Sequence, residues 1–159
     1  MESKKRILRK TIFKFGLILT AMCLVSFIFS YLEKEHLNLP PFKKAMRFIV
    51  IAIPVVFGIR AFKKDNEGFT SFKEALKAGF GISALAGVLM TISYYLFLTV
   101  IEPDTIQQII ELYQAQSIDI SFIKPWLLSL VIGFQIIFTG MIFTLISGLL
   151  LKKSLPATV

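Results

Sequence analysis

The stretch that decides the fold runs from Phe57 to Thr91 and reads FGIRAFKKDNEGFTSFKEALKAGFGISALAGVLMT. It holds a charged loop between two apolar runs. Ser71 stands three residues before Glu74, the spacing of a capping box, in which each side chain accepts a hydrogen bond from the backbone N–H of the other residue. We therefore expect a helix to begin there. Residues 78–101 then carry no charge over 24 residues, enough to cross a hydrocarbon core of roughly 30 Å.

Composition indicates an integral membrane protein. The chain has 159 residues, of which 55% are hydrophobic, and its mean hydropathy is +0.74. A chain of this length favours one domain, so we expect residues 1–159 to form a single all-α transmembrane domain. The four expected spans are residues 12–32, 42–62, 72–101 and 126–151.

The N-terminal segment supports the first span. Residues 1–11 carry five basic side chains and one acidic one, and the apolar run from Ile12 to Leu32 is broken only by Lys14. A cleaved signal peptide is the rival interpretation, because it also has a basic segment before an apolar core. The core is too long for a signal peptide and no small-x-small site follows it, so a retained span is favoured.

The second span is the least regular. Only Phe48 to Ile59 is free of charge, and 12 residues are too few to cross a bilayer. A helix over 42–62 would cross if its basic flanks reached opposite headgroup layers, and Pro54 would remove one N–H from it. The basic residues expected to face headgroups here and in the next loop are Lys43, Lys44, Arg47, Arg60, Lys63 and Lys64.

The distribution of Lys and Arg orients the spans. With four spans, 13 of the 18 basic residues fall on the side that holds both chain ends, whereas a re-entrant second segment would divide them 11 to 7. Cytoplasmic loops carry the excess of Lys and Arg. We therefore expect four crossings with both ends in the cytoplasm, the N-in and C-in topology.

The segment after the third span is acidic and starts a short helix. Residues 102–125 hold four acids and one Lys, which suits the outer side of the membrane. Pro103 fits a first helical turn, and apolar residues follow at spacings of three and four. We expect an amphipathic helix over 103–115 along the outer headgroups, either as a connector or as a partner-binding helix.

Small residues recur every four positions on the last two spans, a pattern that lets two backbones approach closely. The candidate packing residues are Gly79, Ser83, Gly87, Thr91, Gly140, Thr144 and Gly148. They fit a contact within the bundle, a dimer, or a seat for another membrane protein. Gln135 is a polar side chain at membrane depth that needs a partner, either an interhelical hydrogen bond or a substrate.

Residues that carry reaction chemistry are scarce. The sequence has no paired carboxylates, no Ser or Cys near a His, and no metal-ligand spacing, so we expect no catalytic residue, metal or cofactor. A buried structural role is favoured over a reactive thiol for Cys23, and a surface position over a metal ligand for His36. The net charge of +8 comes without a nucleic-acid-binding pattern, so the expected partners are membrane lipids and no nucleic acid.

The run GIRAFKKDNEGFTSFKEALKAGF, residues 58–80, resembles the signature of the family called domain of unknown function 4199. The matching positions are Gly58, Ile59, Lys63, Gly68, Phe69, Ser71, Phe72, Ala75, Leu76, Lys77 and Gly79. The resemblance implies a small four-span protein of the bacterial inner membrane, with no reaction assigned. It also implies an accessory role at a lipid-linked sugar step, beside a polyprenyl-phosphate glycosyltransferase.

These observations support three functional hypotheses. The first is a non-enzymatic structural or accessory subunit that packs against another membrane protein or a second copy. The alternative is a small transporter or flippase-like protein with a polar path near Pro54 and Gln135. The third is an enzyme acting on a lipid phosphate, with Lys43, Lys44, Arg47 or the cytoplasmic lysines as anion-binding groups, and it lacks a nucleophile or a base.

Overall fold

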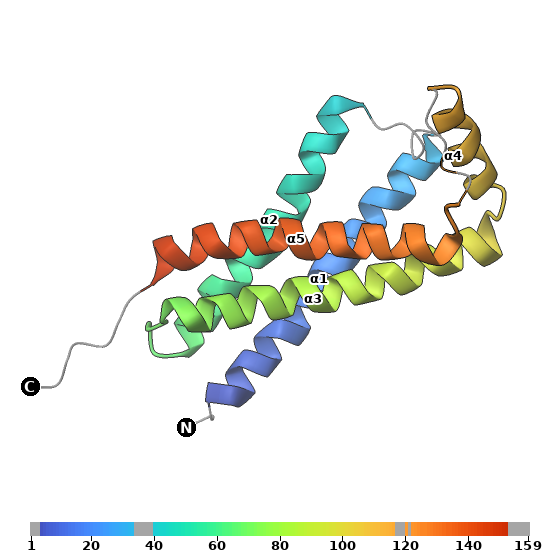
Figure 1. Cartoon of the computed structure of the whole chain (residues 1–159). Coiled ribbons are helices and arrows are strands. Elements are labelled where there is room, and N and C mark those ends of the chain that lie inside the picture. Colours follow the sequence, from blue (N-terminus) through green and yellow to red (C-terminus); the bar gives the residue numbers. More distant parts are fainter. Residues whose placement is uncertain (1–3, 34–39, 117–119, 121, 153–159) are drawn as a thin grey trace, which may run out of the picture.

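The structure is a computed structural model that describes residues 4–33, 40–116, 120 and 122–152; these form five α-helices and one π-helical turn (Figure 1). The elements are α1 (Lys4–Leu32), α2 (Pro41–Asp65), α3 (Phe72–Leu96), η1 (Phe97–Ile101), α4 (Thr105–Gln114) and α5 (Pro125–Leu151). Helices α1, α2, α3 with η1, and α5 are each long and apolar enough to cross a membrane. The all-α architecture with four membrane-length helices is therefore confirmed. His36 lies outside the described residues.

Two helices differ from the simplest expectation in ways that the packing explains. Helix α1 begins at Lys4 rather than at residue 12, because Ile7 and Thr11 are buried while the basic side chains around them are exposed. Helix α2 continues over 25 residues through the buried Pro54. At 1.5 Å per residue it is roughly 37 Å long, so its basic flanks supply the length that its uncharged part lacks.

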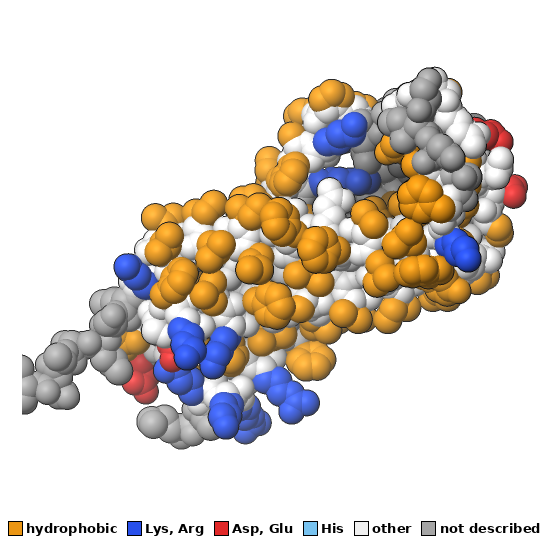
Figure 2. All heavy atoms as spheres, viewed as in Figure 1, with side chains coloured by type: hydrophobic (Ala, Val, Ile, Leu, Met, Phe, Trp, Pro, Cys, Tyr) orange, Lys and Arg blue, Asp and Glu red, His pale blue; other side chains and the backbone are white. Residues whose placement is uncertain are grey.

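The core lies where the four long helices meet. Leu19 of α1, Val55 and Ile59 of α2, and Ile82 and Ala86 of α3 have no exposed surface. The outward faces are apolar as well, and orange side chains cover the middle of the molecule in Figure 2. An apolar surface outside an apolar core is what a helix bundle needs when lipid is its solvent.

One end of the bundle, here called the basic end, joins the start of α1, the end of α2, the start of α3 and the end of α5. Lys4 forms an ion pair with Glu74, and the Lys63 ammonium donates a hydrogen bond of 2.8 Å to the Leu151 carbonyl. A cation at a helix C-terminus also meets the negative end of the helix dipole. Lys and Arg side chains gather at this end in Figure 2.

Different contacts join the helices at the other end of the bundle, here called the opposite end. Lys43 pairs with Glu33, which joins the start of α2 to the end of α1. The Tyr31 hydroxyl donates a hydrogen bond of 2.6 Å to Glu102, directly after η1. Helix α4 lies at this end, with Ile106 packed against the aromatic side chains of α3 and η1.

The connection between α2 and α3 has the geometry of a helix start. The Glu74 N–H donates to the Ser71 hydroxyl at 3.3 Å, and the Ser71 N–H donates to the Glu74 carboxylate at 3.0 Å, so both bonds of a capping box are present. Glu67 and Gly68 before it have φ angles of 57° and 81°. Glycine adopts this left-handed backbone without steric cost, which suits Gly68 to the tight turn.

Candidate binding cavity

A cavity of about 110 Å³ lies between α1, α2, α3 and α5, nearer to the opposite end than to the basic end. Its polar and charged lining side chains are Cys23 and Ser26 of α1, Arg47 of α2, Tyr94 of α3 and Gln135 of α5. We call it the Arg47 cavity. At roughly 30 Å³ per water molecule it has room for a few waters or one small anionic group.

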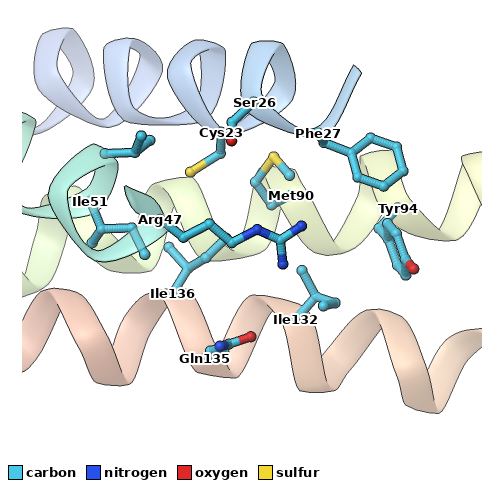
Figure 3. A pocket seen from close by; sticks show the side chains of 11 residues that line it. Cys23, Ser26, Phe27, Arg47, Ile51, Met90, Tyr94, Ile132, Gln135 and Ile136 are labelled. Carbon is cyan, nitrogen blue, oxygen red and sulfur yellow. The ribbon is translucent and has the colours of Figure 1, made fainter. Parts of the chain in front are cut away.

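Arg47 reaches this cavity because of its place on α2. The buried side chains Ile51, Val55 and Ile59 follow each other at spacings of four, and Arg47 lies one turn before Ile51 on the same face. Figure 3 shows the half-buried side chain extending into the space between α3 and α5. It makes no ion pair and no hydrogen bond with another described residue.

Aromatic and aliphatic side chains flank the Arg47 cavity along the bundle axis in both directions. Toward the opposite end, Phe27 and Tyr94 meet edge to face at 5.4 Å between ring centroids, and Phe27 meets Phe97 at 4.9 Å. Toward the basic end, Ile51 and Ile136 line the cavity and the fully buried Val55 and Ile82 lie deeper in the core. Apolar side chains therefore separate the cavity from both ends of the bundle.

The cavity opens sideways instead. Gln135 on α5 is exposed and Arg47 and Val50 on α2 are half-buried, so the opening lies at the seam between α2 and α5. Figure 2 shows a gap beside the N-terminal part of α2, with basic side chains next to it. This opening faces the surroundings of the bundle, where the outward side chains are apolar.

A second hollow of about 530 Å³ follows the seam between α1 and α2. Its walls are almost entirely apolar, with Met22, Val25 and Phe29 from α1 and Met46 from α2. The ion pair of Glu33 and Lys43 lies at one end of it. We call it the α1–α2 groove. It shares Ser26 and Val50 with the Arg47 cavity, so the two spaces adjoin.

The comparison with protein families gives a match over most of the chain. The family described as "protein of unknown function (DUF4199)" has a model that matches residues 14–153. The chain belongs to this family. No curated protein and no solved structure matches it. Membership in DUF4199 therefore supplies no activity, and a function has to be inferred from the geometry of the chain itself.

The basic residues of this DUF4199 member fall into three groups. Lys44, Arg60 and Lys64 are exposed. Lys43 and Lys63 are half-buried and hold specific partners, Glu33 and the end of α5. Arg47 departs from the headgroup-facing position expected from the sequence, because the face of α2 on which it lies turns toward the other three helices.

The small residues of α3 and α5 lie against each other, in antiparallel order. A methyl group added at Gly79 would overlap Thr144, and one added at Gly140 would overlap Ser83. A methyl group at Gly87 would lie 2.9 Å from the Gly133 carbonyl oxygen. The hydroxyls of Ser83, Thr91 and Thr144 donate to the carbonyl four residues earlier on their own helices. The small residues form one stripe on α3 and one on α5. The two stripes therefore face inward, and the side chains of each occupy the space beside the glycines of the other.

Two parts of this arrangement were not anticipated from the sequence. Gly133 extends the α5 stripe and faces Thr91, and its position seven residues before Gly140 is the signal that places both on one face. Gly16 and Gly81 allow α1 to approach α3, where a methyl group would meet Leu85 and Ile12 respectively. Gly16 is the one glycine of α1, and Gly81 has no glycine three or four residues away, so neither belongs to a repeat of glycines.

The lining residues limit the chemistry of the Arg47 cavity. A guanidinium offers five N–H donors in a planar fork that fits a carboxylate or a phosphate. The lining residues include no carboxylate and no histidine, so none can act as a strong general base. Within the described ranges, no group of three His, Cys, Asp or Glu side chains is arranged to hold a metal ion. The arrangement suits binding of an anion.

Proposed function

We propose that this chain is a non-enzymatic membrane protein that binds an anionic ligand in the Arg47 cavity. The observation that carries the proposal is the Arg47 guanidinium, which lies among four membrane-length helices with no carboxylate among the residues that line its cavity. An ionisable side chain inside a membrane bundle is a functional-site hypothesis by default, and its missing partner indicates the ligand.

The cost of burying charge supports an anionic occupant. A charged side chain at the bilayer centre costs about 2.5–3.5 kcal/mol on insertion scales, and pairing or hydration offsets this. Arg47 lies roughly 9 Å along α2 from its start, so its cost is below that of a charge at the bilayer centre. An anion in the cavity would pair with the guanidinium, and the amide of Gln135 is an additional donor in the lining.

The closed ends of the cavity favour binding over passage. A transporter or flippase with a polar path near Gln135 would use this same cavity, but Phe27, Tyr94, Ile51 and Ile136 block a continuous polar route along the bundle. A role as an accessory subunit, beside a polyprenyl-phosphate glycosyltransferase or another membrane protein, would need a surface other than the stripes of α3 and α5. The cavity is therefore the stronger basis for a function.

The proposal includes an orientation. With four spans, 13 of the 18 Lys and Arg residues fall on the side of the basic end, so we place it in the cytoplasm of a bacterial cell, with the chain in the inner membrane. The Arg47 cavity then lies in the outer half of the bilayer. Helix α4, which has half-buried Ile106 and Ile109 and exposed Gln107 and Gln108, lies along the outer surface.

Thermal unfolding with added anions tests the proposal. The purified chain in a non-ionic detergent is titrated separately with inorganic phosphate and with dodecyl phosphate. We expect at least one probe to raise the midpoint of unfolding, because a ligand that binds only the folded state stabilises it by mass action. The variant Arg47→Gln is expected to lose the shift.

Arg60→Gln is the matched control. Arg60 lies on the same helix but is exposed, with its guanidinium 6.0 Å from the ring centroid of Phe57. The variant Arg60→Gln removes the same charge from α2 without changing a residue that lines the cavity. It should therefore keep the shift in unfolding midpoint of the wild-type chain. A shift that is equal in Arg47→Gln, or no shift with either probe in the wild-type chain, would refute anion binding at this site.

A further inference from the structure

We infer that the anionic group bound by Arg47 belongs to a lipid, whose phosphate lies in the Arg47 cavity while its alkyl chain lies in the α1–α2 groove that adjoins it at Ser26 and Val50. This inference deepens the proposed function and depends on it. It names the ligand class as an anionic amphiphile, in contrast to a free anion that arrives from water.

The route of access favours a lipid. Rings from α1, α3 and η1 close the cavity toward the opposite end, through the contacts of Phe27 with Tyr94 and Phe97. Fully buried Val55 and Ile82 close it toward the basic end. A soluble anion would have to pass these apolar barriers or cross lipid. A ligand already dissolved in the bilayer meets the α1–α2 groove directly, and this groove shares Ser26 and Val50 with the cavity.

The shape of the adjoining space fits an alkyl chain. The α1–α2 groove of about 530 Å³ touches the Arg47 cavity at Ser26 and Val50. Its remaining walls are built from aliphatic, aromatic and methionine side chains, apart from Ser30 and the ion pair at its end. A groove of this kind suits a hydrocarbon chain, because methionine side chains adapt to irregular shapes. The two spaces together match a molecule with one charged and one apolar part.

The placement of charge identifies the cation that would hold the phosphate. Lys43 and Arg47 lie one turn apart on α2, so they are separated by roughly 6 Å along the helix axis. Lys43 is held by Glu33 at the end of the groove, whereas Arg47 extends into the cavity away from any described carboxylate. The deeper cation is therefore the one left for a ligand.

A comparison of two probes with the same head distinguishes the sources. Dissociation constants are measured for dodecyl phosphate and for inorganic phosphate by native mass spectrometry of the full chain released from non-ionic detergent. Total molar concentrations are used for both probes, at one fixed detergent concentration. We expect dodecyl phosphate to bind and inorganic phosphate to bind at least about tenfold more weakly, since it forgoes the apolar contacts.

Filling the groove supplies the second arm. Ala21→Phe introduces a ring into the α1–α2 groove, and Ala45→Phe places the same ring on the exposed side of α2, away from both hollows. We expect Ala21→Phe to weaken dodecyl phosphate binding about tenfold, a cost of the order expected for lost apolar contacts, and Ala45→Phe to leave it unchanged. If Ala21→Phe does not fold, affinities of butyl, octyl and dodecyl phosphate for the wild-type chain replace it, and should increase with chain length.

The outcomes separate the two proposals. Equal affinity for both phosphates would overturn the lipid assignment and leave anion binding at Arg47 intact. Unchanged binding of dodecyl phosphate in a folded Ala21→Phe variant, or an affinity independent of chain length, would also overturn the lipid assignment. Binding of neither probe by the wild-type chain would refute both proposals.

Discussion

The hydroxyl of Tyr31 donates a hydrogen bond of 2.6 Å to the carboxylate of Glu102, joining residues 71 positions apart in the sequence. The bond connects the last turn of α1 to the residue that follows η1, and the Tyr31 ring also meets Phe97 edge to face at 5.4 Å. It ties together the two elements whose aromatic side chains close the Arg47 cavity. Its removal should therefore affect stability at that end of the bundle.

Tyr31→Phe is expected to lower the free energy of unfolding, because the bond goes to a charged acceptor and is part-buried. The ring contact with Phe97 is kept in this variant. Unfolding in mixed micelles by a denaturing detergent measures the loss. Tyr95→Phe removes a hydroxyl from an exposed ring of α3 and should change stability far less. Equal effects of the two variants would contradict the assigned role of the bond.

The contact of α3 and α5 predicts a rescue. Gly140→Ala should destabilise the bundle by about 1–3 kcal/mol, because its methyl group would overlap Ser83. Adding Ser83→Gly transfers the free space to the other helix and should restore much of the loss. The same detergent-unfolding measurement applies. A double variant as unstable as Gly140→Ala alone would show that the two residues do not share this contact.

The orientation gives a labelling prediction. In a Cys23→Ala background, Lys63→Cys and Glu111→Cys are exposed separately to a membrane-impermeant maleimide in intact cells and after lysis. We expect Glu111→Cys to react in intact cells and Lys63→Cys to react only after lysis, since their residues lie at opposite ends of the bundle. Reaction of both positions in intact cells, or of neither before lysis, would contradict four crossings with the basic end inside.

Much of this fold can be predicted from the sequence because it depends on local patterns. Uncharged runs, the Ser71 and Glu74 spacing and the repeats of four on α3 and α5 each reflect one helix at a time. The length of α2 is also accessible, once the basic flanks of Phe48 to Ile59 are counted into the helix. These features need no knowledge of which helix meets which.

The Arg47 cavity could not be predicted in this way, because it depends on how α2 is rotated against three other helices. A basic residue in the second turn after Pro41 fits a snorkelling side chain equally well. The available signal was the series Ile51, Val55 and Ile59, which places Arg47 on the buried face if that face is known to turn inward. Gln135 gave a weaker signal, because it lies at the exposed edge of the cavity.

The most direct measurement of anion binding in the Arg47 cavity uses the native thiol of Cys23, which lines it. Its rate of modification is measured with an anionic and with a cationic methanethiosulfonate reagent of similar size, in the wild-type chain and in Arg47→Gln. We expect the ratio of the anionic to the cationic rate to be about three- to tenfold higher in the wild-type chain, because the guanidinium attracts anions into the cavity. The same ratio in both chains would contradict a cavity that selects anions through Arg47.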